Sequence, residues 1–240
     1  MKTIIIIQAR MGSSRLSGKI LKPLGAADSL TYVTERCRKI AGIAEIIVAT
    51  STLPQDDAVE AWCIAHHIAY YRGSEDDVLD RYIQCAKPYN PDYIMRVTSD
   101  CPFVDYELAS EMVALMQAQR VDIIDLASDL PRGLAVEIIS HKALQYIDQH
   151  GREQRHREHV TYYAYEYKEQ FTRVAYTAPS NRHYPELRIT LDTAEDYALL
   201  CNIADHFSAI DVSSSDVIQY LLAHPEVAGL NAHIEQKPVT

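Results

Sequence analysis

Short and almost uninterrupted apolar runs alternate with helical patterns along the first half of the chain, and this alternation constrains the fold more than any other feature. The runs TIIIIQ, EIIVAT and YIMRV place apolar side chains on both faces of a strand, as strands buried on both sides do. The stretches between them repeat apolar residues at helical spacing. Strands and helices that alternate in this way form a parallel sheet covered by helices. The sequence therefore predicts an α/β fold with three layers, α/β/α, and a mostly parallel sheet.

The same patterns predict the individual elements and the organisation of the chain. We expect strands at residues 3–8, 45–50, 68–71, 93–97, 122–126, 134–139, 171–177 and 188–192, and helices at 30–40, 56–67, 75–86, 108–119, 141–149, 153–167 and 194–207. Residues 1–240 are expected to form one domain, in which 128–187 form an insertion over the sheet. The many tyrosines of this insertion suit a dimer contact, and covering the sheet is an equally open role for them.

Charge and cysteine content limit the partners of the chain. The 240 residues carry a formal net charge of −10 at pH 7, which repels nucleic acid and anionic membranes, so we expect neither as a partner. The first apolar run is too short to span a bilayer, and we expect a cytoplasmic protein. The five cysteines are scattered without a CxxC spacing, which is typical of free thiols.

A cationic loop follows the first predicted strand directly. In QARMGSSRLSGK, the side chains of Arg10, Arg15 and Lys19 stand among glycines and serines. Gly12 and Gly18 allow backbone N–H groups to approach an anion closely, and the cations neutralise phosphate charge. Ligands of open α/β sheets bind beyond the carboxyl ends of the strands, where this loop must lie. The spacing matches neither GxxxxGK[ST] nor GxGxxG. The loop predicts a nucleoside triphosphate site, with an ordinary solvated loop as the alternative.

Two aspartates are predicted to end strands at the same edge of the sheet. Asp100 follows the strand at 93–97, and Asp192 ends the strand RITLD. Two carboxylates beside a triphosphate can hold Mg²⁺, which prefers one or two protein carboxylates together with phosphate oxygens and water. The alternative is that these residues cap helices, since Asp192 precedes Thr193 and the helix at 194–207. Asp105 is expected to cap the helix at 108–119.

Seven stretches of the chain carry a resemblance to a known family. They are QARMGSSRLSGK, EIIVATS, YRGSEDDVLDRY, RVTSDCPFVD, PRGLAVEI, REHVT and RITLDTAEDY. In this order, from about residue 3 to about residue 205, they resemble the cytidylyltransferase family that contains KDO and acylneuraminate cytidylyltransferases, and most of all its SpsF branch, the spore coat polysaccharide biosynthesis type. The resemblance implies a Rossmann-like nucleotide-diphospho-sugar transferase architecture.

The resemblance also implies a reaction and a set of residues for it. A sugar hydroxyl would attack the α-phosphorus of CTP and give a CMP-sugar and pyrophosphate. The implied catalytic residues are Arg10, Lys19 and Asp100. The implied magnesium ligands are Asp100 and Asp192. The implied nucleotide-binding residues are Ala9, Arg10, Ser13, Ser14, Arg15, Lys19, Arg72 and Ser74. For the RGSEDD segment, a helix start capped by Ser74 is the alternative to a role near the base.

The second substrate is expected to be a sugar acid, bound by the insertion at 128–187. The segments PRGLAVEI and REHVT supply the expected sugar-binding residues Arg132, Glu137, Arg157 and His159. The chain departs from the family pattern at Ala135, where the SpsF branch commonly has an acidic residue, and at Ser17, where proline is usual. We expect a homodimer.

Two other functions stay open at the level of sequence. The substitution at Ala135 is compatible with a catalytically impaired relative that only binds a nucleotide. A nucleotidyltransferase that uses a different nucleotide and a glycosyltransferase are further alternatives. The glycosyltransferase is expected to carry a DxD-like metal motif, and TSDCP has one aspartate.

Overall fold

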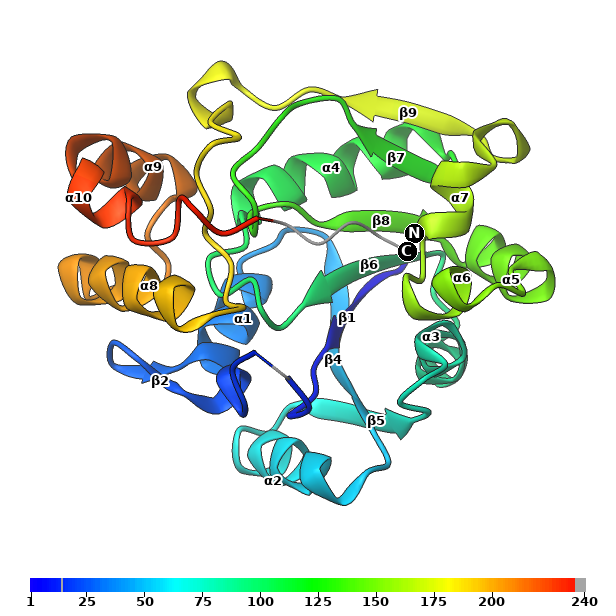
Figure 1. The fold of residues 1–240 in the computed structure, drawn as a ribbon. Helices are drawn as coiled ribbons and strands as arrows, with labels where there is room; N and C mark the ends of the chain where they lie inside the picture. Colours follow the sequence, from blue (N-terminus) through cyan, green and yellow to red (C-terminus); the bar gives the residue numbers. More distant parts are fainter. Residues whose placement is uncertain (14, 236–240) are drawn as a thin grey trace.

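The computed structural model describes residues 1–13 and 15–235, and its centre is a seven-stranded sheet (Figure 1). The strands of this sheet follow the order β5-β4-β1-β6-β8-β7-β9. Their bounds are β1 Thr3–Gln8, β4 Ile43–Ser51, β5 Ala69–Gly73, β6 Tyr93–Thr98, β7 Ile123–Leu126, β8 Glu137–Ser140 and β9 Arg173–Tyr176. A separate two-stranded hairpin pairs β2 (Pro23–Leu24) with β3 (Ala27–Asp28).

Within the sheet, β8 runs against its neighbours, and every other pairing is parallel. β1 pairs in parallel with β4 and β6, β4 with β5, and β7 with β9, while β8 is antiparallel to both β6 and β7. The prediction of a mostly parallel sheet is confirmed. Because β1, β4, β6 and β7 point the same way, the loops after them gather at one edge.

Helices cover both faces of the sheet, as the apolar strands require. The helices are α1 Ser29–Arg38, α2 Asp57–Ala65, α3 Val78–Ala86, α4 Tyr106–Gln119, α5 His141–His150, α6 Gln154–Glu158, α7 Tyr162–Glu166, α8 Ala194–Phe207, α9 Ser214–Ala223 and α10 Pro225–Ala228. On one face, Ile5 and Ile7 of β1 pack with α1, α2 and α4. On the other face, Ile4 and Ile6 pack with α3, α5 and the region of α7. Successive residues of a strand point to opposite faces, so β1 is buried on both sides and the three-layer prediction is confirmed.

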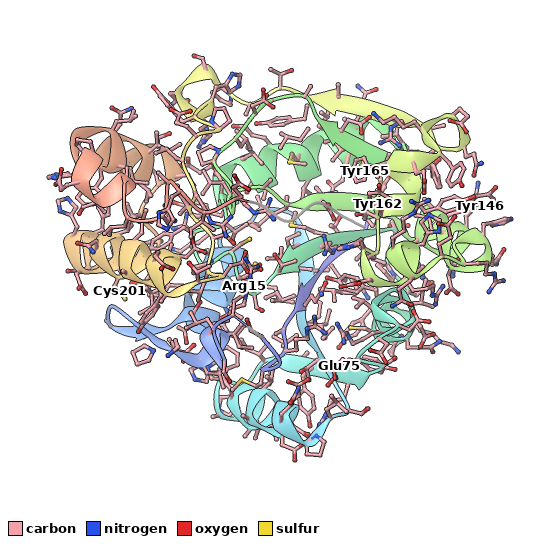
Figure 2. The ribbon with its side chains drawn as sticks, in the orientation of Figure 1. Arg15, Glu75, Tyr146, Tyr162, Tyr165 and Cys201 are labelled. Atoms are coloured by element: carbon pink, nitrogen blue, oxygen red, sulfur yellow. The ribbon has the colours of Figure 1, made fainter. Side chains whose placement is uncertain are left out.

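The range 128–187 takes part in both the sheet and its cover. β8 and β9 are strands of the central sheet, and α5, α6 and α7 lie over one face of it (Figure 1). Aromatic rings of this range pack together, with the ring centroids of Tyr163 and Tyr167 4.5 Å apart. Tyr163 is buried, and Tyr146, at the outer side of α5, is 38 % exposed (Figure 2). The tyrosines thus contribute to covering the sheet, and a role in dimerisation stays a prediction.

Several predicted elements differ in the structure. The single helix expected at 153–167 is two short helices, α6 and α7, separated by a break at residues 159–161. Residues 188–192 form no strand of the sheet, because their backbone pairs with two different loops rather than with one strand. The structure also contains the hairpin β2–β3 and the helices α9 and α10, which the sequence patterns do not predict.

A third apolar cluster, beside the sheet, is built by the C-terminal helices. Side chains of α8 and α9 pack with Tyr32 of α1 and with Phe103. Arg36 of α1 is fully buried and ties this cluster to the rest of the fold. Its Nε donates to the carbonyl oxygen of Val104, and its Nη1 donates to the carbonyl oxygens of Ile210 and Val212. Burial lowers the pKa of the Arg36 guanidinium from its ordinary value.

The substitution Arg36→Met is expected to destabilise the protein by about 3 kcal/mol, because three carbonyl oxygens lose a charged donor. Urea unfolding followed by circular dichroism measures the change. The control is Arg38→Met, since Arg38 on the same helix is half exposed and pairs with Glu35. An exposed pair of this kind contributes less than about 1 kcal/mol. Equal effects of the two substitutions would contradict the proposed role of Arg36.

Candidate active site

A cleft of about 1010 Å³ opens at the carboxyl edge of the sheet and gathers most of the predicted site residues. It is lined by the loop after β1, the loop after β6, the segment before β8 and the α6–α7 region. Arg15, Glu75, Tyr162 and Tyr165, all of which line it, lie around the middle of the molecule in Figure 2. The predicted site residues in its lining are Arg10, Ser13, Arg15, Lys19, Asp100, Arg132, Glu137, His159 and Asp192.

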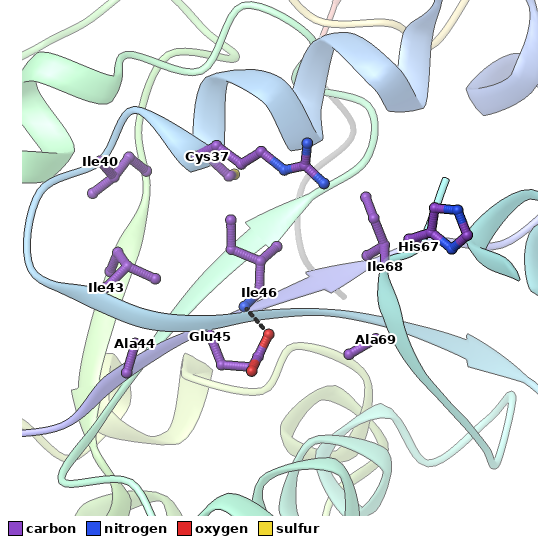
Figure 3. A pocket seen from close by; sticks show the side chains of 10 residues that line it. Cys37, Ile40, Ile43, Ala44, Glu45, Ile46, His67, Ile68 and Ala69 are labelled. Atoms are coloured by element: carbon purple, nitrogen blue, oxygen red, sulfur yellow. Dashed lines mark hydrogen bonds between the residues drawn. The ribbon is translucent and has the colours of Figure 1, made fainter. Parts of the chain in front are cut away.

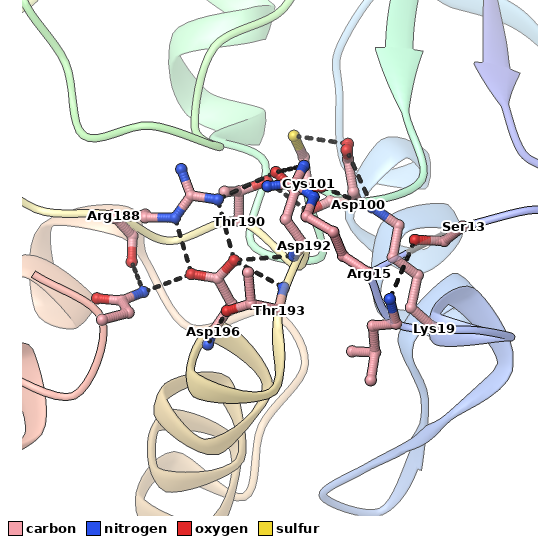
Figure 4. Close-up of polar contacts among 12 residues, drawn as sticks. Ser13, Arg15, Lys19, Asp100, Cys101, Arg188, Thr190, Asp192, Thr193 and Asp196 are labelled. Carbon is pink, nitrogen blue, oxygen red and sulfur yellow. Dashed lines mark hydrogen bonds and ion pairs between the residues drawn. The ribbon is translucent and has the colours of Figure 1, made fainter. Parts of the chain in front are cut away.

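Lys19 stands between the two predicted metal ligands (Figure 4). Its Nζ lies 2.8 Å from Oδ1 of Asp192 and 3.5 Å from Oδ2 of Asp100. The side chains of Lys19 and Asp192 are 12 % and 9 % exposed, and that of Asp100 is 29 % exposed. The sequence separates these residues by 81 and 173 positions, and the structure brings them to one point.

Asp100 and Asp192 reach this point by different routes. Asp100 sits in the turn after β6, as the sequence predicted for a residue that follows a parallel strand. The prediction that Asp192 ends a strand is wrong. It lies on an extended segment in which Ile189 N–H donates to the carbonyl of Arg132 and Leu191 N–H donates to the carbonyl of Asp100. These bonds fasten the segment across the carboxyl edge of the sheet.

Asp192 also does not cap the helix that follows it. Thr193 is the N-cap of α8: its side chain accepts the backbone N–H of Asp196, and the side chain of Asp196 accepts the backbone N–H of Thr193, which together form a capping box. This leaves both carboxylate oxygens of Asp192 free of a capping role. Asp105 does cap α4, as predicted, by accepting the N–H groups of Glu107 and Leu108.

Three cations surround the carboxylate of Asp192. Burial raises the pKa of an aspartate, but the ammonium of Lys19, followed by the guanidiniums of Arg15 and Arg188, outweighs burial and holds the pKa of Asp192 below its ordinary value. Arg15 lies 3.2 Å and Arg188 3.0 Å from Oδ2 of Asp192. The positive charge gathered here suits a polyanion, and the two carboxylates suit a cation.

The donor set fits a magnesium ion shared with phosphates better than a metal held by protein alone. Over the part of the chain that the structure describes, no group of three or more His, Cys, Asp and Glu side chains could hold a metal ion. Asp100 and Asp192 offer oxygen ligands, and both lie within reach of one position, that of the Lys19 ammonium. Mg²⁺ is bound in this manner, by one or two carboxylates with substrate phosphates.

A hydrogen bond holds the start of the cationic loop, and a left-handed glycine turns the chain at its end. Asp56 is fully buried, and its Oδ1 accepts the backbone N–H of Met11 at 2.7 Å. Gly18 has φ of 64°, a left-handed conformation that side chains disfavour, immediately before Lys19. Arg10 extends to Glu75, with 3.4 Å between Nη1 and Oε1. Ser14, a predicted nucleotide-binding residue, lies outside the described residues.

Four predicted site residues do not line the cleft. Ala9 is buried in the core. Arg72 pairs with Asp57 and Glu60 near α2. The hydroxyl of Ser74 accepts the N–H of Asp77, and Asp77, not Ser74, is the N-cap of α3.

Arg157 is the fourth of these residues. Its guanidinium pairs with Asp77 and Asp148, 2.7 and 2.8 Å away, and so joins α6 to α3 and α5. The ligand-binding roles of Ala9, Arg72, Ser74 and Arg157 stay predictions.

Glu137, a predicted sugar-binding residue, pairs in the lining of the cleft with Arg96, which was not predicted as a site residue. Arg96 of β6 donates to Oε2 of Glu137 at 2.8 Å, and Thr161 donates its hydroxyl to the same oxygen at 2.7 Å. Burial alone lowers the pKa of Arg96, but the carboxylate of Glu137 raises it above its ordinary value. An arginine inside the apolar strand YIMRVT was the available signal, since a charge in a buried strand needs a partner.

A second hollow, of about 250 Å³, lies between the end of α1 and the strands β4 and β5 (Figure 3). Its lining is mostly aliphatic, from Ile40, Ile43, Ile46 and Ile68, with a few polar side chains such as His67. None of the predicted site residues that the structure describes lines this hollow, whereas most of them line the larger cleft. No helix within residues 1–13 and 15–235 has the length and apolar character needed to cross a membrane.

The sheet topology and the cleft at its carboxyl edge define an α/β nucleotidyltransferase fold. A solved cytidylyltransferase from Leptospira borgpetersenii serovar Hardjo-bovis (strain JB197) is similar over 99 % of this chain and 100 % of that chain, with a TM-score of 0.90 and 32 % identity. The family model described as cytidylyltransferase matches residues 4–221. The chain therefore belongs to the cytidylyltransferase family.

One further relative and one solved structure are similar to the chain. The spore coat polysaccharide biosynthesis protein SpsF of Bacillus subtilis (strain 168) is 35 % identical over 231 residues, which cover 94 % of this chain and 96 % of SpsF. The structure of CMP:2-keto-3-deoxy-manno-octonic acid synthetase complexed with CTP has a TM-score of 0.60 at 18 % identity, covering 80 % of this chain and 94 % of that one, and so shows a shared fold. The resemblance to the family and to its SpsF branch is confirmed.

The lowered pKa of Asp192 predicts a specific dependence of stability on pH. A carboxylate with a lowered pKa in the folded state stabilises the fold above its unfolded pKa of about 3.9, and this contribution is lost as the pH falls through the folded pKa. The difference in unfolding free energy between the unsubstituted protein and Asp192→Asn should shrink from about pH 5 to about pH 2. Urea unfolding at each pH measures it, with the exposed Asp216→Asn as control. A difference that stays constant would contradict the prediction.

Proposed function

We propose that this protein is a Mg²⁺-dependent cytidylyltransferase that couples CTP to a sugar acid, giving a CMP-sugar and pyrophosphate for a surface polysaccharide or glycan. One observation carries the proposal: Lys19 lies 2.8 Å from Asp192 and 3.5 Å from Asp100 in the cleft that Arg10 and Arg15 also line. Cations for a triphosphate and carboxylates for its metal thus meet at one position.

The cationic loop binds the triphosphate. Arg10 and Arg15 are 40 % and 36 % exposed, so they can exchange their carboxylate partners for phosphate oxygens without unfolding the loop. The left-handed turn at Gly18 aims Lys19 into the cleft. Fixed cations stabilise the negative charge that develops on a pyrophosphate leaving group, and this gives Arg10 and Lys19 their catalytic role.

Asp100 and Asp192 hold the magnesium ion. When bound, Mg²⁺ neutralises phosphate charge and orients the phosphates as a Lewis acid and template. Three cations neutralise Asp192 in the structure, and a triphosphate offers Lys19 and Arg15 other partners. The carboxylate that they release is then available to the metal.

The acceptor binds at the other end of the cleft, beside β8. Arg132 is exposed there and supplies a cation for the carboxylate of a sugar acid. Glu137 is fixed by Arg96 and Thr161, so its second oxygen, Oε1, is oriented to accept from a sugar hydroxyl. His159 lines the same region. The hydroxyl oxygen of the acceptor attacks the α-phosphorus and gives up its proton to water. The bond from that phosphorus to the pyrophosphate oxygen breaks, and pyrophosphate leaves with the bonding electrons.

The comparisons support the finer parts of this proposal. The name of SpsF associates that relative with a spore coat polysaccharide, and the more distant structural neighbour is a CMP-sugar synthetase with CTP bound. We further propose a cytoplasmic homodimer, with the exposed Tyr146 side of the 128–187 range as the contact.

Incubation with CTP, Mg²⁺ and a panel of sugar acids, followed by detection of pyrophosphate and of the CMP-sugar by mass spectrometry, tests the function. Release of pyrophosphate that requires one sugar acid supports the proposal. Binding of CTP without pyrophosphate from any acceptor would favour the catalytically impaired relative, in which Ala135, exposed in the cleft, is the relevant departure.

The substitution Asp100→Asn is expected to reduce metal-dependent turnover by about a hundredfold or more, because it removes one of the two charged metal ligands. Mutation of residues that only orient a metal ligand already reduces metal affinity or activity by about tenfold to a hundredfold. Asp100 is partly exposed, so the melting temperature should change little. The control is Asp129→Asn, a cleft carboxylate with no role in the proposal. Unchanged turnover in Asp100→Asn would remove Asp100 from the metal site.

The nucleotide is expected to be CTP. A ligand that binds only the folded state raises the melting temperature, and the rise grows with the ratio of the ligand concentration to its Kd. With Mg²⁺ present, CTP should raise the melting temperature more than UTP, GTP or a UDP-sugar at the same concentration. A larger shift with UDP-sugars would point to a glycosyltransferase, and one with UTP or GTP to a nucleotidyltransferase of another specificity.

A further inference from the structure

We infer that Asp196 and Asn231 are positioning residues, which act through Arg188 to fix the carboxylate of Asp192 at the edge of the cleft. The inference rests on the proposed function, in which Asp192 holds the metal ion. Asn231 lies in the C-terminal segment after α10, so this segment would contribute to the active site through Asp196 and Arg188.

Asp196 is the centre of the network (Figure 4). It is fully buried at the third position of α8. Its Oδ2 accepts the backbone N–H of Asp192 at 2.9 Å and that of Thr193 at 3.1 Å. The bond from Thr193 belongs to the capping box, but the bond from Asp192 is not part of that motif. This second bond fixes the backbone of Asp192 itself.

The guanidinium of Arg188 connects Asp196 to the side chain of Asp192. Its Nε donates to Oδ1 of Asp196 at 2.8 Å, and its Nη2 lies 3.0 Å from Oδ2 of both Asp196 and Asp192. Such a planar, two-pronged pair holds the guanidinium in one orientation. Arg188 therefore fixes Oδ2 of Asp192, and Oδ1 is directed to Lys19 in the cleft.

Asn231 closes the network from the C-terminal segment. It is 1 % exposed, and its Nδ2 donates to Oδ1 of Asp196 at 2.8 Å and to the carbonyl oxygen of Arg188 at 3.0 Å. Both hydrogens of the amide are used, so Asn231 holds the carboxylate and the backbone of its two partners at once. In a buried network of this kind each hydrogen bond is stronger than in water.

Because the network orients Asp192, its loss is expected to weaken metal binding, whereas the loss of a helix cap alone would lower only the stability of the helix. Partners that orient a metal-binding carboxylate change metal affinity or activity by about tenfold to a hundredfold when they are removed. Loss of Asn231 frees Asp196 and Arg188 to shift, and the carboxylate of Asp192 then rotates away from the cleft. The triphosphate binds to the cationic loop, and the two hydrogen bonds that the Asn231 amide donates go to Arg188 and Asp196, not to that loop.

The test is the substitution Asn231→Ala in the full chain, with Asn202→Ala as the matched control. Asn202 is an exposed asparagine of α8 whose amide donates to the carbonyl of Ala198. Crystal structures of both variants show where the Asp192 carboxylate lies. The Mg²⁺ concentration for half-maximal turnover is measured together with the KM for CTP.

For Asn231→Ala we expect Asp192 to leave hydrogen-bond distance of Arg188 Nη2, and the half-maximal Mg²⁺ concentration to rise about tenfold while the KM for CTP changes less than about twofold. Asn202→Ala should match the unsubstituted protein in each measurement. An unmoved Asp192, an unchanged Mg²⁺ requirement, or equal changes in the Mg²⁺ requirement and the KM would each overturn the inference.

The crystal structures keep this test separate from the proposed function. If the unsubstituted protein releases no pyrophosphate with any acceptor, the proposed function fails, and the position of Asp192 in the variant still decides whether Asn231 and Asp196 position it. Should Asn231→Ala not fold, Asp196→Asn replaces it, because the amide keeps the shape of Asp196 and removes the charge that orients Arg188. The same measurements and outcomes apply.

Discussion

The contact of Lys19 with Asp100 and Asp192 is the interaction on which the rest of the site depends. Two carboxylates gathered at the edge of a protein core need positive charge beside them to offset the hydration that they lose. Lys19 provides that charge between them, and Arg15 and Arg188 add to it at Asp192. Under the proposed function, these paired cations and anions exchange partners with a metal–triphosphate complex.

The fold creates this contact by bringing three distant segments to one edge. The loop after β1 carries Lys19, and the turn after β6 carries Asp100. Asp192 lies on a third segment, whose backbone is hydrogen-bonded to Arg132 and Asp100. Gly133, with φ of 98°, makes the close approach of this segment possible, because a Cβ at this position would lie 2.2 Å from the carbonyl oxygen of Ile189. Only glycine permits the two segments, at Gly133 and at Ile189, to lie so near each other.

Charged residues were the least predictable part of the site. Arg10, Arg15 and Lys19 line the cleft, as their place after an apolar strand suggested, but Arg72 and Arg157 pair with carboxylates elsewhere. A long cationic side chain can reach any of several acids, and which acid is near depends on how the helices pack. Arg96, conversely, was hidden in an apolar strand and is paired with Glu137.

The sequence by itself determined the α/β class, the parallel core strands, the layers of helices and the cationic loop at the carboxyl edge of β1, because hydrophobic periodicity and glycine placement are local properties. Only the tertiary structure decided that Asp192 arrives on an extended segment outside the sheet, that His159 lies at a break between two helices, and that Asn231 closes a network behind the site. These features arise from contacts between segments far apart in the chain, and local patterns carry no information about which distant donor meets which acceptor.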